Sequence, residues 1–257
     1  MIDPWAAPWS TPGEGAPLVL ALDTSSRIGG VALSRGFEVL AEETWLVGGA
    51  GKPHGGAHDD VGVRRARDVG SHTQQVLPAA ARLCERSGHT IAQLGLIVVA
   101  LGPGSFTGLR VGASLGKGLS VALGVPLVGV PTLDAIAHQH RTVPGHLVAL
   151  VDAGRGQVYA GTYRGGTRGL VRRGEYQVLS DEELLAHVGA LKGGAWVVGE
   201  LWPERGRALA ALEKVRVATP AGTLRRTALL AELGYARFLR GDVPEPAALQ
   251  PMYLKRG

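Results

Sequence analysis

Two stretches of this 257-residue chain share one pattern, and that repetition limits the fold more than any other feature. The first stretch is LVLALDTSSRIGGVALSRG (18–36) and the second is LVALVDAGRGQVYAGTYRG (147–165). Each has an apolar strand that ends in an aspartate, a turn of small residues, and a second strand of alternating pattern. Self-similarity of this kind predicts two related lobes. Because hairpins are common, a chance match is the alternative explanation.

A strand–helix–strand unit lies between the two stretches. Residues 94–101 (LGLIVVAL) are apolar on both faces, as the middle strand of a parallel sheet requires. A glycine-rich turn, a helix over 106–123 and a strand over 126–130 follow, and such crossovers are right-handed in nearly all proteins. The predicted class is therefore α/β with two lobes. Further expected elements are helices at 71–86, from Asp181 and at 223–239, and a strand at 196–198.

The pattern divides the chain into three parts. Residues 1–16 hold prolines and glycines without periodicity and are expected to form a flexible N-terminal extension. Residues 17–131 form the expected first lobe, and residues 132–257 form a smaller second lobe. Within the first lobe, residues 48–70 combine glycine, histidine and charge without a pattern, which is typical of an exposed loop.

Composition narrows the setting in which the chain works. The single cysteine, Cys84, excludes an intramolecular disulfide and a zinc ion held by a cysteine cluster. No apolar run of about 18 residues and no signal peptide is present, so we expect a cytoplasmic protein without membrane contact. The net charge is +5, and only five of the 27 basic residues are lysine. This excess of arginine is compatible with a nucleic-acid partner or with a generally arginine-rich surface.

A polar cluster lies at the end of the first expected strand. Asp23 is followed by Thr24 and two serines, and Asp152 takes the matching place in the second stretch. Ligands of open α/β sheets bind at the carboxyl ends of strands, where a carboxylate and hydroxyls can hold a metal or a phosphate. Aspartate and serine also cap turns by bonding to their own backbone, and both interpretations stay open.

The most distinctive stretch is GPGSFTGLR, residues 102–110. It lacks the spacing of a P-loop, and Thr107 stands where a dinucleotide fingerprint needs its third glycine. Gly102 and Gly104 lie in a turn before a helix, where free N–H groups can attract an anion. Ser105 is also a plausible N-cap of that helix, which is the structural alternative.

Small residues recur every four positions along the helix at 106–123. The repeat consists of Gly104, Gly108, Gly112, Gly116, Ser120 and Gly124. One face of the helix is therefore almost without side chains, although each interior glycine costs about 1 kcal/mol of helix propensity. A neighbouring apolar stripe consists of Val111, Leu115, Leu119 and Leu123. Either both stripes pack inside one lobe, or one of them meets a second helix or subunit.

Histidines give no support for catalysis. His138 and His140 are two residues apart, so on a helix they point to different faces and make poor metal co-ligands. His54 and His58 lie in the expected loop. His72 follows Ser71, the expected helix cap, and is more typical of a helix-end contact than of a base. The G-x-S-x-G motif of a hydrolase is not present.

These motifs together resemble the TsaB (YeaZ) family. The residues that carry the resemblance are ALDTSS, SHTQQVLPAAARL, LGPGSFTGLRVGASLGKGLSVALGVPLVGVPTLDAIA, VDAGRGQVYAGTY and the terminal PMYLK. They run from about Leu18 to Lys255. The resemblance implies a two-lobed actin-like ATPase (ASKHA) fold, with duplicated β-hairpin/βαβ lobes of which the second is reduced.

The resemblance also implies a function: the non-catalytic, activating subunit of the complex that puts threonylcarbamoyl on the tRNA adenosine next to the anticodon. Its implied partners are a TsaD-like catalytic subunit and a TsaE-like ATPase, with tRNA met through the complex and a homodimer as a further arrangement. In the catalytic relative, two histidines bind the metal where this chain has Thr132 and Ile136. No catalytic residue, no metal and no required cofactor are therefore expected, and the chain is also short for that relative.

The implied sites fall into two sets. A vestigial site for weak ATP or ADP binding would comprise Asp23, Thr24, Gly102 and Gly104. The partner surface would be a helical bundle formed by the helices at 71–86 and 106–123. Its expected residues are His72, Leu77, Gly108, Val111, Gly112, Leu115, Gly116 and Leu119. The alternative function is an active actin-fold kinase or carbamoyltransferase that uses Asp23 and the glycine-rich turn on ATP.

Overall fold

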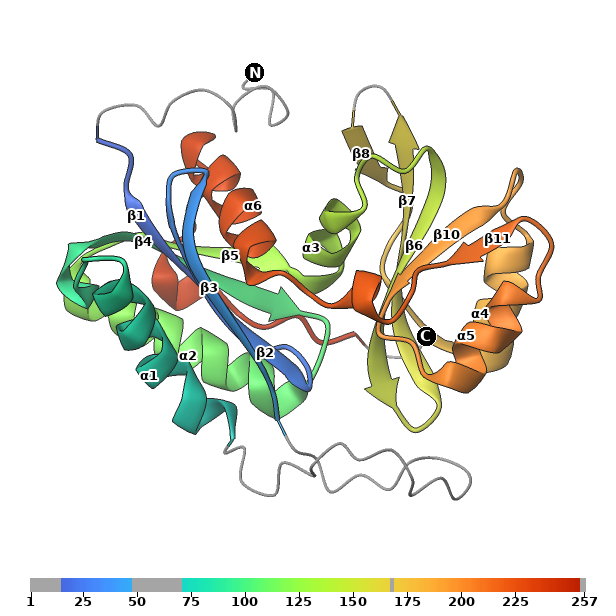
Figure 1. Cartoon of the computed structure of the whole chain (residues 1–257), viewed down its shortest axis with the longest axis horizontal. Helices are drawn as coiled ribbons and strands as arrows, with labels where there is room; N and C mark the ends of the chain where they lie inside the picture. Colours follow the sequence, from blue (N-terminus) through green and yellow to red (C-terminus); the bar gives the residue numbers. More distant parts are fainter. Residues whose placement is uncertain (1–14, 48–70, 167–168, 255–257) are drawn as a thin grey trace.

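Two mixed sheets lie side by side and form two lobes (Figure 1). The computed structural model describes residues 15–47, 71–166 and 169–254. The expected loop at 48–70 lies outside the described residues, as does the expected extension at 1–16 except for its last two positions. Within the described ranges, no helix is long and apolar enough to cross a bilayer.

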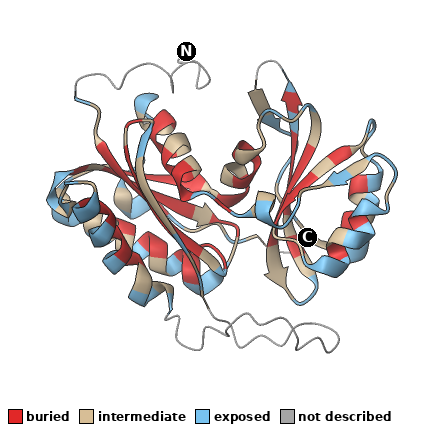
Figure 2. Cartoon of the chain, viewed as in Figure 1, coloured by how far each residue is buried: buried red, intermediate tan, exposed pale blue. Residues whose placement is uncertain are grey.

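The first sheet has the strand order β3-β2-β1-β4-β5. Its strands are β1 (Leu18–Asp23), β2 (Ile28–Arg35), β3 (Glu38–Leu46), β4 (Leu94–Gly102) and β5 (Leu127–Pro131). The helices α1 (His72–Arg86) and α2 (Phe106–Leu123) cover one face, and α6 (Thr227–Leu239) covers the other (Figure 1). Both faces of β1 and β4 are buried, which explains their continuous apolar sequences (Figure 2).

The second sheet has the order β11-β10-β6-β7-β8, and β9 pairs with β7. Its strands are β6 (Gly145–Gly154), β7 (Gln157–Gly166), β8 (Gly169–Arg172), β9 (Gln177–Ser180), β10 (Ala195–Gly199) and β11 (Val215–Val217). The helices α4 (Asp181–Gly189) and α5 (Pro203–Ala210) pack on one face, and α3 (Thr132–Gln139) packs on the other. The described part of the chain also contains three short 3₁₀ helices: η2 (Ile91–Gln93), η3 (Ala221–Thr223) and η4 (Pro246–Ala248).

The predicted duplication is present in the strand pairing. β1 pairs antiparallel with β2 and parallel with β4. In the same way, β6 pairs antiparallel with β7 and parallel with β10. The α/β two-lobed prediction is therefore confirmed. The expected reduction of the second lobe lies in its helices, since α4 and α5 have 9 and 8 residues while α1 and α2 have 15 and 18.

The C-terminal part of the chain differs from the expected boundary at 132–257, because it returns to the first lobe. Ala231 and Tyr235 of α6 belong to the apolar cluster on one face of the first sheet. Leu249 belongs to the cluster on the opposite face, and the Met252 N–H donates to the Leu101 carbonyl at 2.7 Å. The physical reason is that the face of the first sheet away from α1 and α2 would otherwise stay open to water.

Candidate functional site at the junction of the lobes

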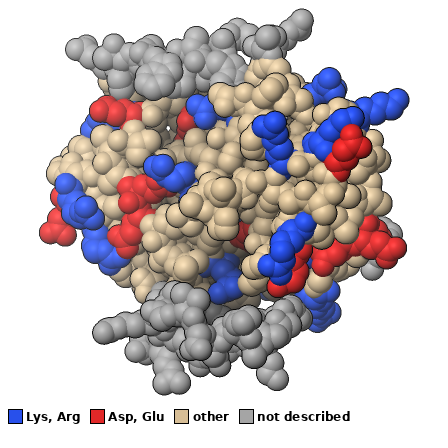
Figure 3. Space-filling view, turned by 45° about the vertical axis from the view of Figure 1, so that its right-hand side comes forward, with Lys and Arg blue, Asp and Glu red and all other residues tan. Residues whose placement is uncertain are grey.

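The two aspartate-bearing turns meet at a cleft between the lobes. The cleft has a volume of about 1240 Å³. Ser26 and Arg27 line it from the first lobe, and Asp152, Glu200 and Trp202 line it from the second. On the face shown in Figure 3, lysine and arginine side chains are interspersed with acidic ones rather than gathered into one basic field. The polar groups at the end of β1 are the candidates for a functional role in this cleft.

Asp23 holds its own turn together. It is the last residue of β1, and its side chain is buried. Its Oδ1 accepts hydrogen bonds from the Ser25 N–H at 2.9 Å and from the Ser25 Oγ–H at 2.6 Å. Thr24 faces α2, where its hydroxyl donates to the Gly108 carbonyl at 2.7 Å. One oxygen of Asp23 therefore serves the turn, and only Oδ2 is left for another partner.

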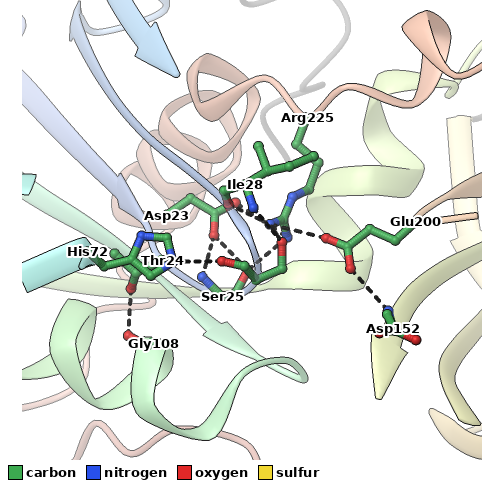
Figure 4. A network of polar contacts seen from close by, with 10 residues as sticks. Asp23, Thr24, Ser25, Ile28, His72, Gly108, Asp152, Glu200 and Arg225 are labelled. Carbon is green, nitrogen blue, oxygen red and sulfur yellow. Dashed lines mark hydrogen bonds and ion pairs between the residues drawn. The ribbon is translucent and has the colours of Figure 1, made fainter. Parts of the chain in front are cut away.

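That partner is a residue that the sequence did not bring to attention. Arg225 lies in the segment that leads from the second lobe back to α6, and its side chain is 5% exposed. Its Nη1 lies 3.6 Å from Asp23 Oδ2 and donates to Ser25 Oγ at 2.8 Å. Figure 4 shows the guanidinium between this turn and Glu200 of the second lobe, whose Oε1 lies 3.5 Å from Nη2.

These contacts do not fit a metal or a phosphate at Asp23. A metal ligand needs a free carboxylate oxygen, whereas both oxygens of Asp23 already face donors of the chain. Among the described residues, no group of three or more histidine, cysteine or acidic side chains is arranged to hold a metal ion. The cap interpretation, which the sequence left open, is the one that the hydrogen bonds of Asp23 fit.

The glycine-rich turn is likewise engaged with the chain itself. The Ser105 N–H donates to the Ser25 carbonyl at 2.7 Å, and Ser105 Oγ accepts from the Gly108 N–H at 3.2 Å as the N-cap of α2. A Cβ atom on Gly104 would collide with the Ser25 carbonyl oxygen. Gly102 has a φ of +98°, which favours glycine, and it packs against Leu109. The close approach of the Ser25 backbone therefore explains the glycine at position 104, and the positive φ explains the glycine at position 102.

The glycine stripe of α2 packs inside its own lobe, and the expectation that it faces another subunit is wrong. A Cβ atom on Gly108 would collide with the Thr24 carbonyl oxygen. On Gly112 it would lie 2.5 Å from Thr24 Oγ1, and on Gly116 it would lie 2.5 Å from Val99 Cγ1. The close backbone approach that the helix requires is the approach of α2 to β1 and β4.

The other expected interface residues are spread over different environments. Leu115 and Leu119 are half-buried and pack against the core of the first lobe, and Val111 is half-buried as well. His72 begins α1, and its Nε2 lies 2.7 Å from the Ser26 carbonyl oxygen. Burial lowers the pKa of His72 below its ordinary value. Leu77, 42% exposed, is the only one of the eight expected interface residues that is neither buried nor half-buried.

The positions equivalent to the metal-binding histidines are part of a core. Thr132 begins α3 and is buried, and its hydroxyl has no hydrogen-bond partner. Ile136 is buried in an apolar cluster with Leu133 and residues of β6. Asp134, on the same helix, accepts hydrogen bonds from the Tyr163 and Tyr176 hydroxyls, each at 2.7 Å. These side chains join α3 to the second sheet.

The two sheets, the duplicated hairpins and the cleft between them define an α/β protein of the two-lobed actin-like ATPase class. A structure of YeaZ from Pseudomonas aeruginosa matches with a TM-score of 0.69 and 23% identity, and the match covers 93% of this chain and 100% of that one. By sequence, residues 67–193 match the family model "TsaD: tRNA N6-adenosine threonylcarbamoyltransferase".

Two TsaB proteins are more similar in sequence. The Bacillus subtilis tRNA threonylcarbamoyladenosine biosynthesis protein TsaB is 34% identical over 147 residues, which cover 57% of this chain and 55% of that protein. The Escherichia coli TsaB is 30% identical over 142 residues, 53% of this chain and 62% of that protein. The chain is therefore similar to the TsaB proteins in sequence and to YeaZ in fold. These alignments span less than two thirds of the length of either TsaB protein.

Proposed function

We propose that this chain is the non-catalytic partner of a TsaD-like catalytic subunit in the threonylcarbamoyl modification of tRNA adenosine. Sequence similarity supports the proposal, since the relatives from B. subtilis and E. coli are named as tRNA threonylcarbamoyladenosine biosynthesis proteins. The engaged carboxylate of Asp23 and the buried Ile136 support a subunit without a reaction centre of its own. The chain works in the cytoplasm, meets tRNA within the complex and needs no cofactor itself.

The observation that carries the proposal is the outward face of α1 and α2, the side of these helices that points away from the first sheet. Small and apolar residues are exposed there, among polar ones such as Gln74, Arg82 and Glu85 of α1 and Arg110 of α2: Thr73, Leu77, Pro78 and Ala81 on α1, and Ser114, Gly118, Val121 and Ala122 on α2. Leu77 is 42% and Val121 is 76% exposed. Small side chains allow another helix to approach closely, and exposed apolar groups on a helix pair are typical of a protein interface.

A TsaD-like subunit is the occupant that we assign to this face. A TsaE-like ATPase joins the complex as a further partner, and a second copy of this chain is the competing occupant. The face is built from the elements that the family resemblance indicated, but from different residues of α2. Val121, Ser114 and Gly118 replace the buried glycines as the residues in contact.

The test is a matched pair of leucine substitutions on opposite faces of one sheet. Leu77→Glu places a charge on the outward face of α1, whereas Leu239→Glu does so at the end of α6, where the leucine is 38% exposed. We expect Leu77→Glu to weaken binding to a TsaD-like protein at least tenfold, because a buried unpaired charge costs several kcal/mol. Leu239→Glu should bind like the unaltered chain.

Calorimetry or co-elution measures the binding, and thermal melts verify that both variants are folded. The proposal fails if Leu77→Glu binds as tightly as Leu239→Glu. Activity of the isolated chain is the second measurement. Threonylcarbamoyl transfer to tRNA, or ATP turnover, by this chain without a TsaD-like subunit would favour the alternative of an active actin-fold enzyme.

A further inference from the structure

The surroundings of Arg225 form a cage of oxygen atoms. Two of them belong to carboxylates: Asp23 Oδ2 at 3.6 Å and Glu200 Oε1 at 3.5 Å from the guanidinium nitrogens. Two are the hydroxyls of Ser25 and Ser26, and the last is the Ile28 carbonyl at 2.9 Å (Figure 4). Every atom that faces the guanidinium terminus in these contacts is an oxygen.

Such a set of atoms suits a hard cation. Carboxylates, hydroxyls and backbone carbonyls are the donors that Mg²⁺ and Ca²⁺ prefer in proteins. Here the cation is part of the chain, since an arginine side chain does not lose its proton in a protein. With 5% of the Arg225 side chain, 8% of the Asp23 side chain and 18% of the Glu200 side chain exposed, water screens these charges little.

The cage also joins the two lobes. Asp23, Ser25 and Ile28 belong to the hairpin of the first lobe, and Glu200 follows β10 in the second. Glu200 Oε2 in turn accepts a hydrogen bond from the Asp152 N–H at 3.1 Å. The guanidinium therefore connects both aspartate-bearing turns, the second of them through Glu200.

We propose that Arg225 is a built-in counter-ion that takes the place of a divalent cation between the lobes, and that its removal turns the oxygen cage into a divalent-cation site. In the unaltered chain, the guanidinium balances the buried carboxylate of Asp23 and the half-buried one of Glu200, and it excludes a metal ion. Without it, two carboxylates are left in one buried site, and a divalent cation is the small ligand that neutralises both. This inference does not depend on the proposed partner.

The experiment compares the full chain with Arg225→Ala and with the matched control Arg226→Ala. Arg226 is the next residue, carries the same charge and pairs with Glu42, but its side chain is 57% exposed. Thermal melts are recorded with and without millimolar Mg²⁺, and Mn²⁺ binding is measured by electron paramagnetic resonance. We expect Arg225→Ala to melt several degrees lower, to recover much of that loss with Mg²⁺, and to bind Mn²⁺ at a site that Asp23→Asn abolishes.

The unaltered chain and Arg226→Ala should show no Mg²⁺-dependent shift and no Mn²⁺ site at Asp23. Mn²⁺ binding by the unaltered chain that Asp23→Asn removes would overturn the proposal, as would an Arg225→Ala variant that folds and binds no Mn²⁺. If Arg225→Ala yields no folded protein under either condition, Arg225→Lys decides. A lysine variant that folds and does not bind Mn²⁺ supports the proposal that the positive charge at this position is a counter-ion. A lysine variant that binds Mn²⁺ or fails to fold contradicts the proposal.

Discussion

The glycines of α2 have different surroundings along one helix, and this difference can be measured residue by residue. Gly112 faces the turn that follows β1, where a Cβ atom would lie 2.5 Å from Thr24 Oγ1. Gly118 is exposed on the same helix, and a Cβ atom there would have no neighbour within 4 Å. The helix propensity gained on replacing glycine by alanine is the same at both positions, about 1 kcal/mol. Any difference between the two variants therefore reports the contact with this turn.

We expect Gly118→Ala to stabilise the chain by about 0.5–1 kcal/mol. Gly112→Ala should destabilise it by about 1–3 kcal/mol, because Thr24 must move and the hydrogen bond from its hydroxyl to Gly108 is strained. Chemical denaturation of both variants measures the free energies of unfolding. Equal stabilisation by the two substitutions would mean that α2 does not pack on Thr24 through its glycine face.

Half-buried histidines give the molecule a defined pH dependence. Burial lowers the pKa of four of them: His72, His140, His146 and His187. A histidine whose pKa is lower in the folded than in the unfolded state binds more protons when unfolded, so stability rises with pH through this range. These histidines leave the folded state fully stable above their unfolded pKa of about 6.5. As the pH falls below that value, the unfolded chain binds more protons and the stability of the folded state decreases.

We therefore expect the melting temperature to fall by several degrees between pH 7.5 and pH 5.5. His72→Gln should reduce this fall, because glutamine can still donate to the Ser26 carbonyl but does not titrate. Thermal melts of the two chains across the range provide the comparison. An unaltered chain whose melting temperature is flat or rises toward pH 5.5 would show that the burial of these histidines does not control stability.

At the scale of elements, the long regular segments could be predicted and the short ones could not. The helix expected at 106–123 has those bounds in α2, and the strand expected at 94–101 differs from β4 by one residue. Both have a strong periodic pattern over many positions. α5 and β8, with 8 and 4 residues, have no such pattern, and their place is decided by tertiary contacts.

The candidate site was predictable only where its residues are adjacent in sequence. Asp23 and Ser25 are two positions apart, and their turn could be inferred from residue type alone. Arg225 lies 200 positions from Ser25, in a chain rich in arginine, and nothing in its neighbours distinguishes it from a surface residue. The glycine stripe posed the same difficulty, because the pattern shows that a backbone comes close but not whose backbone it is.

For the molecule as a whole, the sum of charges is a poor guide to what it binds. The net charge of +5 suggested a nucleic-acid partner as one reading. In the structure, however, many arginines already have an acidic partner. Such pairs among the described residues are Arg82–Glu43, Arg205–Asp181, Arg225–Asp23, Arg226–Glu42 and Arg237–Asp242. A cation with a carboxylate beside it gains less from a phosphate. On the face that Figure 3 shows, basic and acidic side chains are interspersed.

We accordingly expect the isolated chain to bind tRNA only non-specifically, with a Kd of about 10⁻⁴ to 10⁻⁶ M at physiological salt. The complex with a TsaD-like subunit should bind more tightly, because the second surface contributes its own phosphate contacts. Fluorescence anisotropy with labelled tRNA at low and physiological salt measures both affinities. If the isolated chain bound tRNA in the nanomolar range with little salt dependence, the tRNA site would lie on this subunit, and the outward face of α1 and α2 would no longer be sufficient to explain its role.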